Sequence, residues 1–118
     1  MENVDLAEYR SRFASCELVM LADISTLTVL GSDSAIKMGQ EHLDALCATA
    51  ERIFDLAQDE QIRTAVLSKP TGRQVFVRAG SAMSEVICGV FEPTAEIGDA
   101  IIDAQNMLSA TNAEAFGI

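Results

Sequence analysis

Apolar positions at helical spacing mark the first segment of the chain. Leu6, Tyr9 and Phe13 recur three or four residues apart within residues 4–15. Side chains at this spacing share one face of a helix. Acidic residues occur near the start, where the partial positive charge of a helix N-terminus favours them. The pattern predicts a short amphipathic helix over residues 4–15.

Two longer helices follow from the same period. The main one is predicted over residues 35–58, and the serines and aspartate at 32–34 are its candidate N-caps. Its apolar stripe consists of Leu43, Leu46, Cys47, Ala50, Ile53, Phe54 and Ala57. The last helix is predicted to begin after Thr94 as N-cap and to bury Ile97, Ile101, Ala104 and Leu108. Residues 111–118 are expected to fray.

Five segments have the composition of β-strands, at residues 17–23, 26–30, 61–68, 74–78 and 85–91. The first and last are apolar throughout rather than alternating, which is typical of strands covered on both faces. Residues 69–73, Lys-Pro-Thr-Gly-Arg, predict a turn, because proline presets φ and glycine supplies a positive φ or closes the turn. Gly89 inside the last strand indicates a close packing partner or a bulge.

The order of these elements predicts the fold class. The order is α-β-β-α-β-β-β-α, and the strands are joined by hairpins, so the sheet is expected to be mainly antiparallel. Strands that are buried on both faces need helices on both sides. The sequence therefore predicts a single domain over residues 1–118, with its core at about 4–110. Its architecture is an α/β three-layer sandwich around one five-stranded sheet.

Charge and composition narrow the classes of partner. The chain has 118 residues, a net charge of −10, and 5% aromatic residues without tryptophan. Nucleic acids and anionic membranes are polyanions that proteins bind through Lys and Arg, so neither is an expected partner. Hydrophobic residues make up 49% of the chain. Counted with glycine, they exceed the roughly 45–50% of an average domain, which indicates apolar surface buried against another chain.

Cysteine usage and the apolar runs predict a compartment. The longest apolar runs, at 18–22 and 86–91, are far shorter than the roughly 20 residues of a membrane span, so no membrane insertion is expected. The acidic, polar first residues do not resemble a secretory signal. Three scattered cysteines without a C-x-x-C pair predict reduced thiols in a cytoplasmic protein, with one disulfide plus a free thiol as the alternative.

The sequence contains no strong candidate for a catalytic site. Residues 31–37 have a Gly and a Lys but lack the second Gly and the hydroxyl of a P-loop, so we interpret them as a strand end and helix cap. His42 and Cys47 are five positions apart, which places them off a common helical face. One His and three scattered Cys do not make a standard zinc site. We interpret the carboxylate pairs Glu41/Asp44 and Glu96/Asp99 as parts of solvated helix faces, or as a negative face that recruits a basic partner. We expect no enzyme activity, no cofactor and no metal.

The order of elements and several local motifs resemble the Roadblock family, in the profilin-like and longin-like class. The resemblance covers about residues 4–110. It rests on the hairpin from 18–23 to 26–32, the long helix, the strand-turn-strand through 69–73, and the Glu-Ile-Gly-Asp at 96–99. Gly98 matches the asparagine-leucine-glycine opening of the family's final helix, although Glu96 replaces the asparagine. The family's turn glycine after Asp23 is also replaced.

The resemblance implies binding rather than catalysis. Similar domains form homodimers or heterodimers in which the long helices pair and the third strands join edge to edge. These dimers act as scaffolds for small Ras-like GTPases or motor subunits. The residues of the third strand agree with this edge-to-edge pairing, because the strand at 62–68 has no Pro or dense Lys to protect a free edge. The predicted interface comprises His42, Ala45, Thr49, Arg52, Leu56, Ile62, Thr64, Ala65 and Val66.

Two other function classes stay open at the level of sequence. Related three-layer domains of the profilin-like or PAS-like kind hold a small molecule between helix and sheet. Such a pocket needs a few polar groups that face inward, and the apolar stripes of this chain show none. An enzyme is the third class, because a missing motif is weak evidence against activity.

Overall fold

The computed structural model describes residues 5–57, 62–78 and 84–115. The order of elements is the predicted α-β-β-α-β-β-β-α. The three helices are α1 (Leu6–Arg12), α2 (Gln40–Ala57) and α3 (Gly98–Ala115). The five strands are β1 (Cys16–Asp23), β2 (Thr28–Ser34), β3 (Thr64–Lys69), β4 (Gly72–Arg78) and β5 (Glu85–Phe91).

All five strands form one antiparallel sheet in the order β2-β1-β5-β4-β3. The strands predicted to be covered on both faces are β1 and β5, and both lie near the middle of the sheet with most of their side chains buried. The two edges are formed by β2 and β3. The predicted fold class, a three-layer α/β sandwich, is confirmed.

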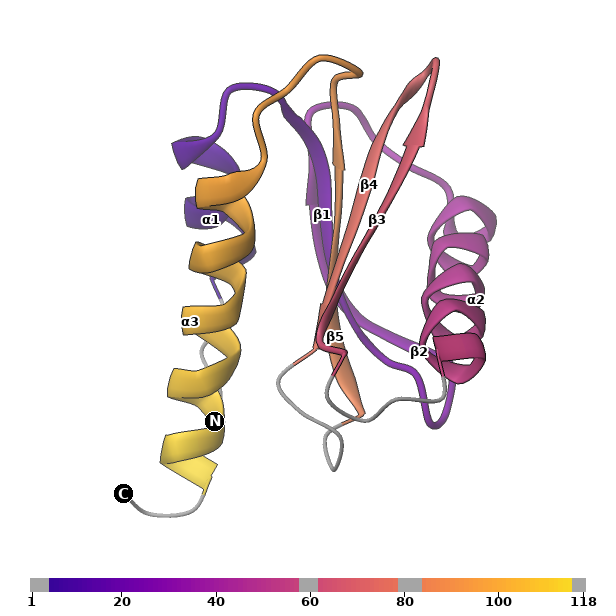
Figure 1. Ribbon diagram of the computed structural model, residues 1–118, viewed down its shortest axis with the longest axis vertical. Coiled ribbons are helices and arrows are strands. Elements are labelled where there is room, and N and C mark those ends of the chain that lie inside the picture. Colours follow the sequence, from indigo (N-terminus) through magenta and orange to yellow (C-terminus); the bar gives the residue numbers. More distant parts are fainter. Residues whose placement is uncertain (1–4, 58–61, 79–83, 116–118) are drawn as a thin grey trace.

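The helices form one layer on each side of the sheet. Figure 1 shows α1 and α3 on one face and α2 alone on the other. The α1/α3 face buries Tyr9, Val19, Val75, Val77, Ile87, Phe91, Ala100, Ala104 and Leu108. The α2 face buries Leu18, Met20, Leu43, Leu46, Cys47, Ala50, Phe54, Phe76, Val86 and Cys88. The Tyr9 hydroxyl donates a hydrogen bond of 2.8 Å to the Ala100 carbonyl, which joins α1 to α3, and burial raises the pKa of Tyr9.

Two predicted helix starts are wrong. Residues 32–34 are not N-caps, because they continue β2 and pair with β1. The helix α2 begins after Gly39, whose carbonyl accepts from the main-chain N–H groups of His42 and Leu43. Thr94 is likewise not an N-cap, since a turn precedes α3 and the Arg73 side chain donates to the Ala95 carbonyl at 3.0 Å. At residues 32–34 strand pairing outweighs the local capping preference, whereas at Thr94 a local turn, closed by the Ala95 N–H on the Glu92 carbonyl at 3.1 Å, takes the place of the cap.

The other helix boundaries differ less from the prediction. Asp5 is the N-cap of α1 and accepts from the main-chain N–H of Glu8 at 3.0 Å. α1 ends at Arg12, three residues before the predicted end. α3 continues to Ala115, so helix occupies most of the predicted frayed tail, and residues 116–118 lie outside the described residues.

One edge of the sheet is irregular. Leu21 pairs with Gly31 and Ala22 pairs with Val29, so Leu30 is an extra residue that forms a bulge in β2. The turn before β2 contains Leu27 with φ of +55°, the one positive φ among the described non-glycine residues. This turn occupies the place where the resembling family has a glycine, and a leucine is strained there.

Two glycines are explained by close approach. A Cβ on Gly72 would lie 2.8 Å from the Phe91 carbonyl oxygen, and one on Gly89 would lie 2.7 Å from the Phe91 ring. Gly89 therefore has the close packing partner that the sequence indicated. Gly72 closes the turn between β3 and β4, and its φ lies outside the left-handed region.

Candidate dimer interface

The outer side of α2 carries the predicted helical strip. The stripe toward the sheet includes the buried Leu43, Leu46, Cys47, Ala50 and Phe54. His42, Ala45, Arg52 and Leu56 are exposed, and Thr49 is partly exposed. The Thr49 hydroxyl donates to the Ala45 carbonyl at 2.9 Å, so its hydrogen-bonding need is met within the helix. The strip is therefore mostly small or apolar side chains around one guanidinium group.

The strand β3 presents a free main-chain edge. Its register with β4 is continuous from Thr64 opposite Val77 to Lys69 opposite Gly72. The main-chain N–H of Arg78 donates to the Arg63 carbonyl at 2.8 Å, which makes residues 63 and 78 a hydrogen-bonded pair. Such pairs alternate along an antiparallel ladder. The N–H and C=O groups of Thr64, Val66 and Ser68 therefore point away from β4, and no strand among the described residues pairs with them.

The predicted strand residues divide between the two faces. Ala65 packs with the apolar cluster under α2. Thr64 lies on the α3 face, because the Gln105 amide donates to its hydroxyl at 3.2 Å. Val66 shares that face, since side chains alternate along a strand. The N–H of Ala65 faces Phe76 in the ladder, so this residue contributes no hydrogen bond to the free edge.

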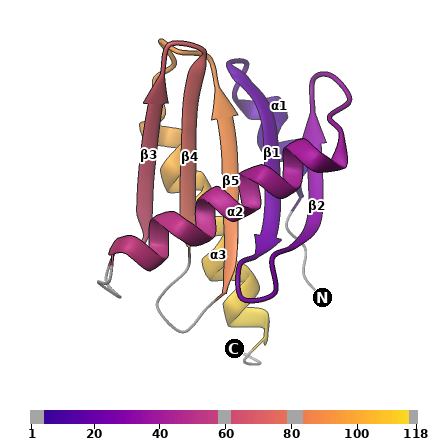
Figure 2. The same cartoon turned by 90° about the vertical axis from the view of Figure 1, so that its right-hand side faces the viewer.

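A groove separates the outer side of α2 from β3. It has a volume of about 310 Å³ and is lined by Ala48, Thr49, Arg52, Ile53, Leu56 and Leu67. Figure 2 shows why it forms: α2 crosses the sheet diagonally, and its C-terminal end reaches β3. The groove brings together three predicted residues, Thr49, Arg52 and Leu56. It adds Leu67, which the sequence interpretation missed because its strand gave no sign of facing a helix end.

Arg78 is a second residue that the sequence interpretation missed, and it lies between the last turns of α2 and the segment before β3. The Arg78 guanidinium lies 4.5 Å from the centre of the Phe54 ring, at the inner side of α2. Its Nε also donates to the Ile62 carbonyl at 2.8 Å. Arg78 thereby ties the segment before β3 to the last turns of α2. This pairing across elements has no local sequence signal.

The charges on α2 are unequal. Its exposed carboxylates are Glu41, Asp44, Glu51 and Asp55, and Arg52 is its one Lys or Arg. Within the described ranges no carboxylate lies at ion-pair distance from Arg52. The Asp44 carboxylate accepts from the Gln40 amide at 2.8 Å. The helix therefore presents an acidic face. The Arg52 guanidinium beside the groove has no ion-pair partner among the described residues.

The remaining sequence candidates do not assemble into a reaction site. His42 is exposed and Cys47 is buried on the opposite side of α2. Glu41, Asp44, Glu96 and Asp99 are all exposed, as expected for solvated faces. In the described part of the chain, no three His, Cys, Asp or Glu side chains are grouped to hold a metal.

All three cysteines are buried and unpaired. Burial raises the pKa of Cys47 and Cys88, and it raises the pKa of Cys16 to about 11. The thiols are therefore protonated at neutral pH and act as small apolar side chains. The structure places no cysteine in the candidate interface.

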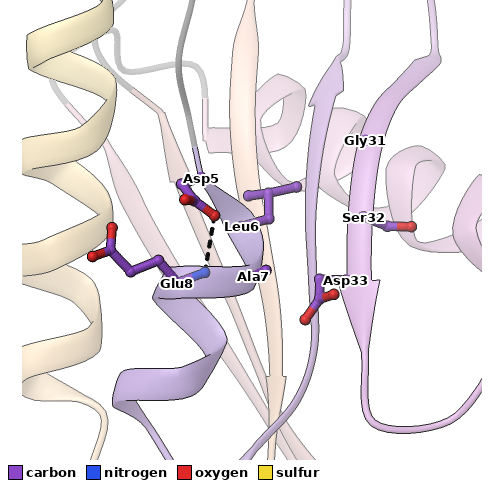
Figure 3. A pocket seen from close by; sticks show the side chains of 7 residues that line it. All are labelled: Asp5, Leu6, Ala7, Glu8, Gly31, Ser32 and Asp33. Carbon is purple, nitrogen blue, oxygen red and sulfur yellow. Dashed lines mark hydrogen bonds between the residues drawn. The ribbon is translucent and has the colours of Figure 1, made fainter.

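An open hollow of about 720 Å³ lies between α1 and β2 (Figure 3). Its aspartates already have partners. Asp5 caps α1 through the N–H of Glu8, and Asp33 pairs with Arg10 at 2.6 Å. Neither carboxylate is therefore free to bind a ligand.

Solved structures with the same architecture identify the fold. A Roadblock/LC7 domain from Streptomyces avermitilis superposes with a TM-score of 0.78 at 11% identity and covers 94% of each chain. The chain has the Roadblock/LC7 fold. MglB from Myxococcus xanthus gives a TM-score of 0.70 at 12% identity, over 91% of this chain and 90% of that one. The gliding protein MglB from Thermus thermophilus gives 0.67 at 20% identity, over 92% and 86%. No family model and no curated protein matches the sequence.

In this chain α2 crosses one face of the sheet, and only its C-terminal end lies beside the edge strand β3 (Figure 2). The sequence resemblance predicts that these two elements pair between copies. Among the described residues, no helix is long and apolar enough to span a bilayer.

Proposed function

We propose that this chain is a non-catalytic binding module that forms a homodimer through α2 and β3 and serves as a scaffold for a protein partner. The observation that carries the proposal is the collection of exposed apolar side chains at one edge of the sheet. Leu56, Ile62 and Val66 are three of the seven exposed large apolar residues in the described ranges. All three belong to the predicted interface. Burial of such a patch is the main driving force for association.

A comparison of the two sheet edges supports β3 as the pairing strand. β2 carries the Leu30 bulge, which twists an edge away from regular pairing. β3 has continuous register, no bulge, and outward N–H and C=O groups on Thr64, Val66 and Ser68. A two-fold axis beside Val66 would pair β3 with its copy and satisfy these groups.

Charge supports pairing of the helices. In a two-fold arrangement the Arg52 of one copy faces the acidic outer side of the other α2, where Asp44 and Glu51 are exposed. The apolar groove beside Arg52 closes in the same contact. A solved MglB with 18% identity and a TM-score of 0.61 is described as having a tetrameric arrangement, so copies of that protein do associate.

Light scattering after gel filtration tests the dimer. The expected mass is twice the chain mass of 12.6 kDa. Val66→Pro removes an N–H that faces the free edge, where proline is tolerated, and should yield a folded monomer. Val66→Thr keeps the N–H and is the matched control, which should remain dimeric. A wild-type mass near 12.6 kDa at micromolar concentration would overturn the proposal.

The partner class follows from the sequence resemblance, namely a small Ras-like GTPase or another protein. The exposed carboxylates on α2 suit a partner with a basic surface. A tagged chain is used to capture partners from the source cell, followed by mass spectrometry. We expect a P-loop GTPase with the wild type and a weaker yield with Val66→Pro. Enrichment of the same proteins by wild type and by an unrelated acidic protein would refute a specific scaffold role.

A small-molecule sensor is not favoured by any observation. No polar or charged residue is buried among the described residues, in either core layer. The space between α2 and the sheet is filled by apolar side chains.

A further inference from the structure

The strand β3 lies in a locally cationic part of an acidic chain. Residues 62–78 contain four Lys or Arg and no Asp or Glu, although the whole chain has eighteen acidic residues against eight basic ones. Arg73 faces the α3 layer, where its side chain donates to a main-chain carbonyl. The other three, Arg63, Lys69 and Arg78, lie on the α2 face of the sheet. A strand that joins the free edge of β3 therefore meets positive charge on that face.

The alternation of side chains along β3 sets the face of its two cations. Ala65 packs under α2, and Arg63 and Lys69 are two and four residues away from it, so all three side chains share one face. Arg63 and Lys69 are exposed, and no carboxylate among the described residues lies at ion-pair distance from either. Arg63 is also in register with Arg78 on β4, whose guanidinium lies over the Phe54 ring of α2. Like charges are thus already side by side at this end of β3.

The proposed pairing of two β3 strands brings these cations together between copies. The outward N–H and C=O groups of Thr64, Val66 and Ser68 are all satisfied when Val66 lies opposite Val66 of the second copy. In that register Arg63 lies opposite Lys69 of the second copy, and Lys69 lies opposite its Arg63. Opposite residues have Cβ atoms about 4.5–5.5 Å apart, and like charges at this distance destabilise the pairing. The homodimer would therefore contain two like-charge pairs in its central ladder.

We infer that Arg63 and Lys69 make β3 prefer a strand from a different protein, one that carries Asp or Glu opposite each of them. The occupant is an antiparallel strand with two carboxylates six residues apart, the separation of Arg63 and Lys69, and an apolar residue midway, opposite Val66. Main-chain hydrogen bonds to the free edge supply affinity, and the two charge pairs supply specificity. The isolated chain pairs with its own copy, and the acidic strand displaces that copy. The inference rests on the proposed use of β3 as the pairing edge.

Charge reversal at Lys69 tests the inference within the chain itself. In a Lys69→Glu homodimer both cross-strand pairs join Arg63 to a carboxylate, so the dissociation constant should fall about tenfold in sedimentation equilibrium. This gain opposes the effect of net charge, which becomes more negative in the variant. Lys37→Glu makes the same change of charge at an exposed residue between β2 and α2, and should not lower the constant. An equal fall in both variants would overturn the inference.

The double variant Arg63→Glu with Lys69→Glu supplies the acidic strand of the inferred partner. Its own homodimer again has two like-charge pairs, now of carboxylates, so its dissociation constant should lie within about threefold of the wild-type value. When it is mixed with the wild type, every cation on one β3 faces a carboxylate on the other. Native mass spectrometry should find about nine-tenths of the dimers mixed, against about half by chance. A mixed share of about half would also overturn the inference.

The remaining outcomes separate this inference from the proposed function. A wild-type dimer whose dissociation constant is unchanged or raised by Lys69→Glu overturns the charge preference and leaves the homodimer intact. A rise would assign Lys69 to a carboxylate of the second copy. A wild type that is monomeric alone refutes the homodimer, and mixed dimers with the double variant would then still support the charge preference. Monomers both alone and in the mixture refute both proposals.

Discussion

The truncation Leu56→Ala measures how much α2 contributes to association. Leu56 is 70% exposed in the single chain, so its loss should change the free energy of unfolding of that chain by no more than about 0.5 kcal/mol. Each copy of a two-fold dimer buries its own Leu56. The dissociation constant should therefore respond far more than stability does.

The size of the effect can be worked from the exposure. Truncation to alanine removes about three methylene equivalents, each worth about 0.8 kcal/mol when fully buried. Scaled by the 70% that is available for burial, this gives about 1.7 kcal/mol per copy and about 3.4 kcal/mol per dimer. Because 1.4 kcal/mol is a factor of ten, the dissociation constant should rise about two hundredfold to three hundredfold.

Sedimentation equilibrium over a dilution series measures this constant. Ile36→Ala is the matched control, because Ile36 is 68% exposed and lies in the segment between β2 and α2, outside the proposed interface. It should leave the constant within about twofold. Equal constants for wild type and Leu56→Ala would refute the assignment of α2 to the interface, even if the protein is a dimer.

Three further predictions concern the fold. Gly72→Ala places a Cβ 2.8 Å from a main-chain carbonyl oxygen of β5 and should lower the free energy of unfolding by about 1–3 kcal/mol. In the control Gly39→Ala, the new Cβ meets no atom within 4 Å, so the free energy of unfolding should not fall. Urea denaturation measures both variants. Leu27→Gly relieves a positive φ and should raise stability by up to about 1 kcal/mol, while Leu30→Gly should lower it by about 0.5–1 kcal/mol; the same sign for both would contradict the strain. The three buried thiols should react slowly with a thiol reagent at pH 8 in the native state and all react after unfolding, so fast native labelling would show that burial does not protect them.

Periodicity predicted the elements well because it reports burial directly. The stripe through Leu43, Leu46 and Phe54 fixed the inner side of α2, and the outward position of His42 and Leu56 then followed from the same helical period. The central place of β1 and β5 followed from their lack of alternation. These inferences need only the geometry of one element.

The features that the sequence did not predict all depend on two elements at once. The N–H direction of Ala65 depends on the register of β3 with β4. The Arg78 contact with Phe54 joins a strand to a helix that lies more than twenty residues away in the chain. The false N-caps at 32–34 are serines and an aspartate that a neighbouring strand recruits. Local preference is weak compared with the free energy of completing a sheet.

The difference between the two sheet edges would limit the size of the proposed assembly. In the proposed dimer, pairing through β3 would use that edge in both copies, and the outermost strands would be the two bulged β2 strands. Growth by edge pairing would therefore stop at two chains, instead of continuing into a filament. The extra residue at Leu30 acts as a terminator for the sheet, and a chain in which it is deleted would carry two regular edges and the capacity for open-ended polymerisation.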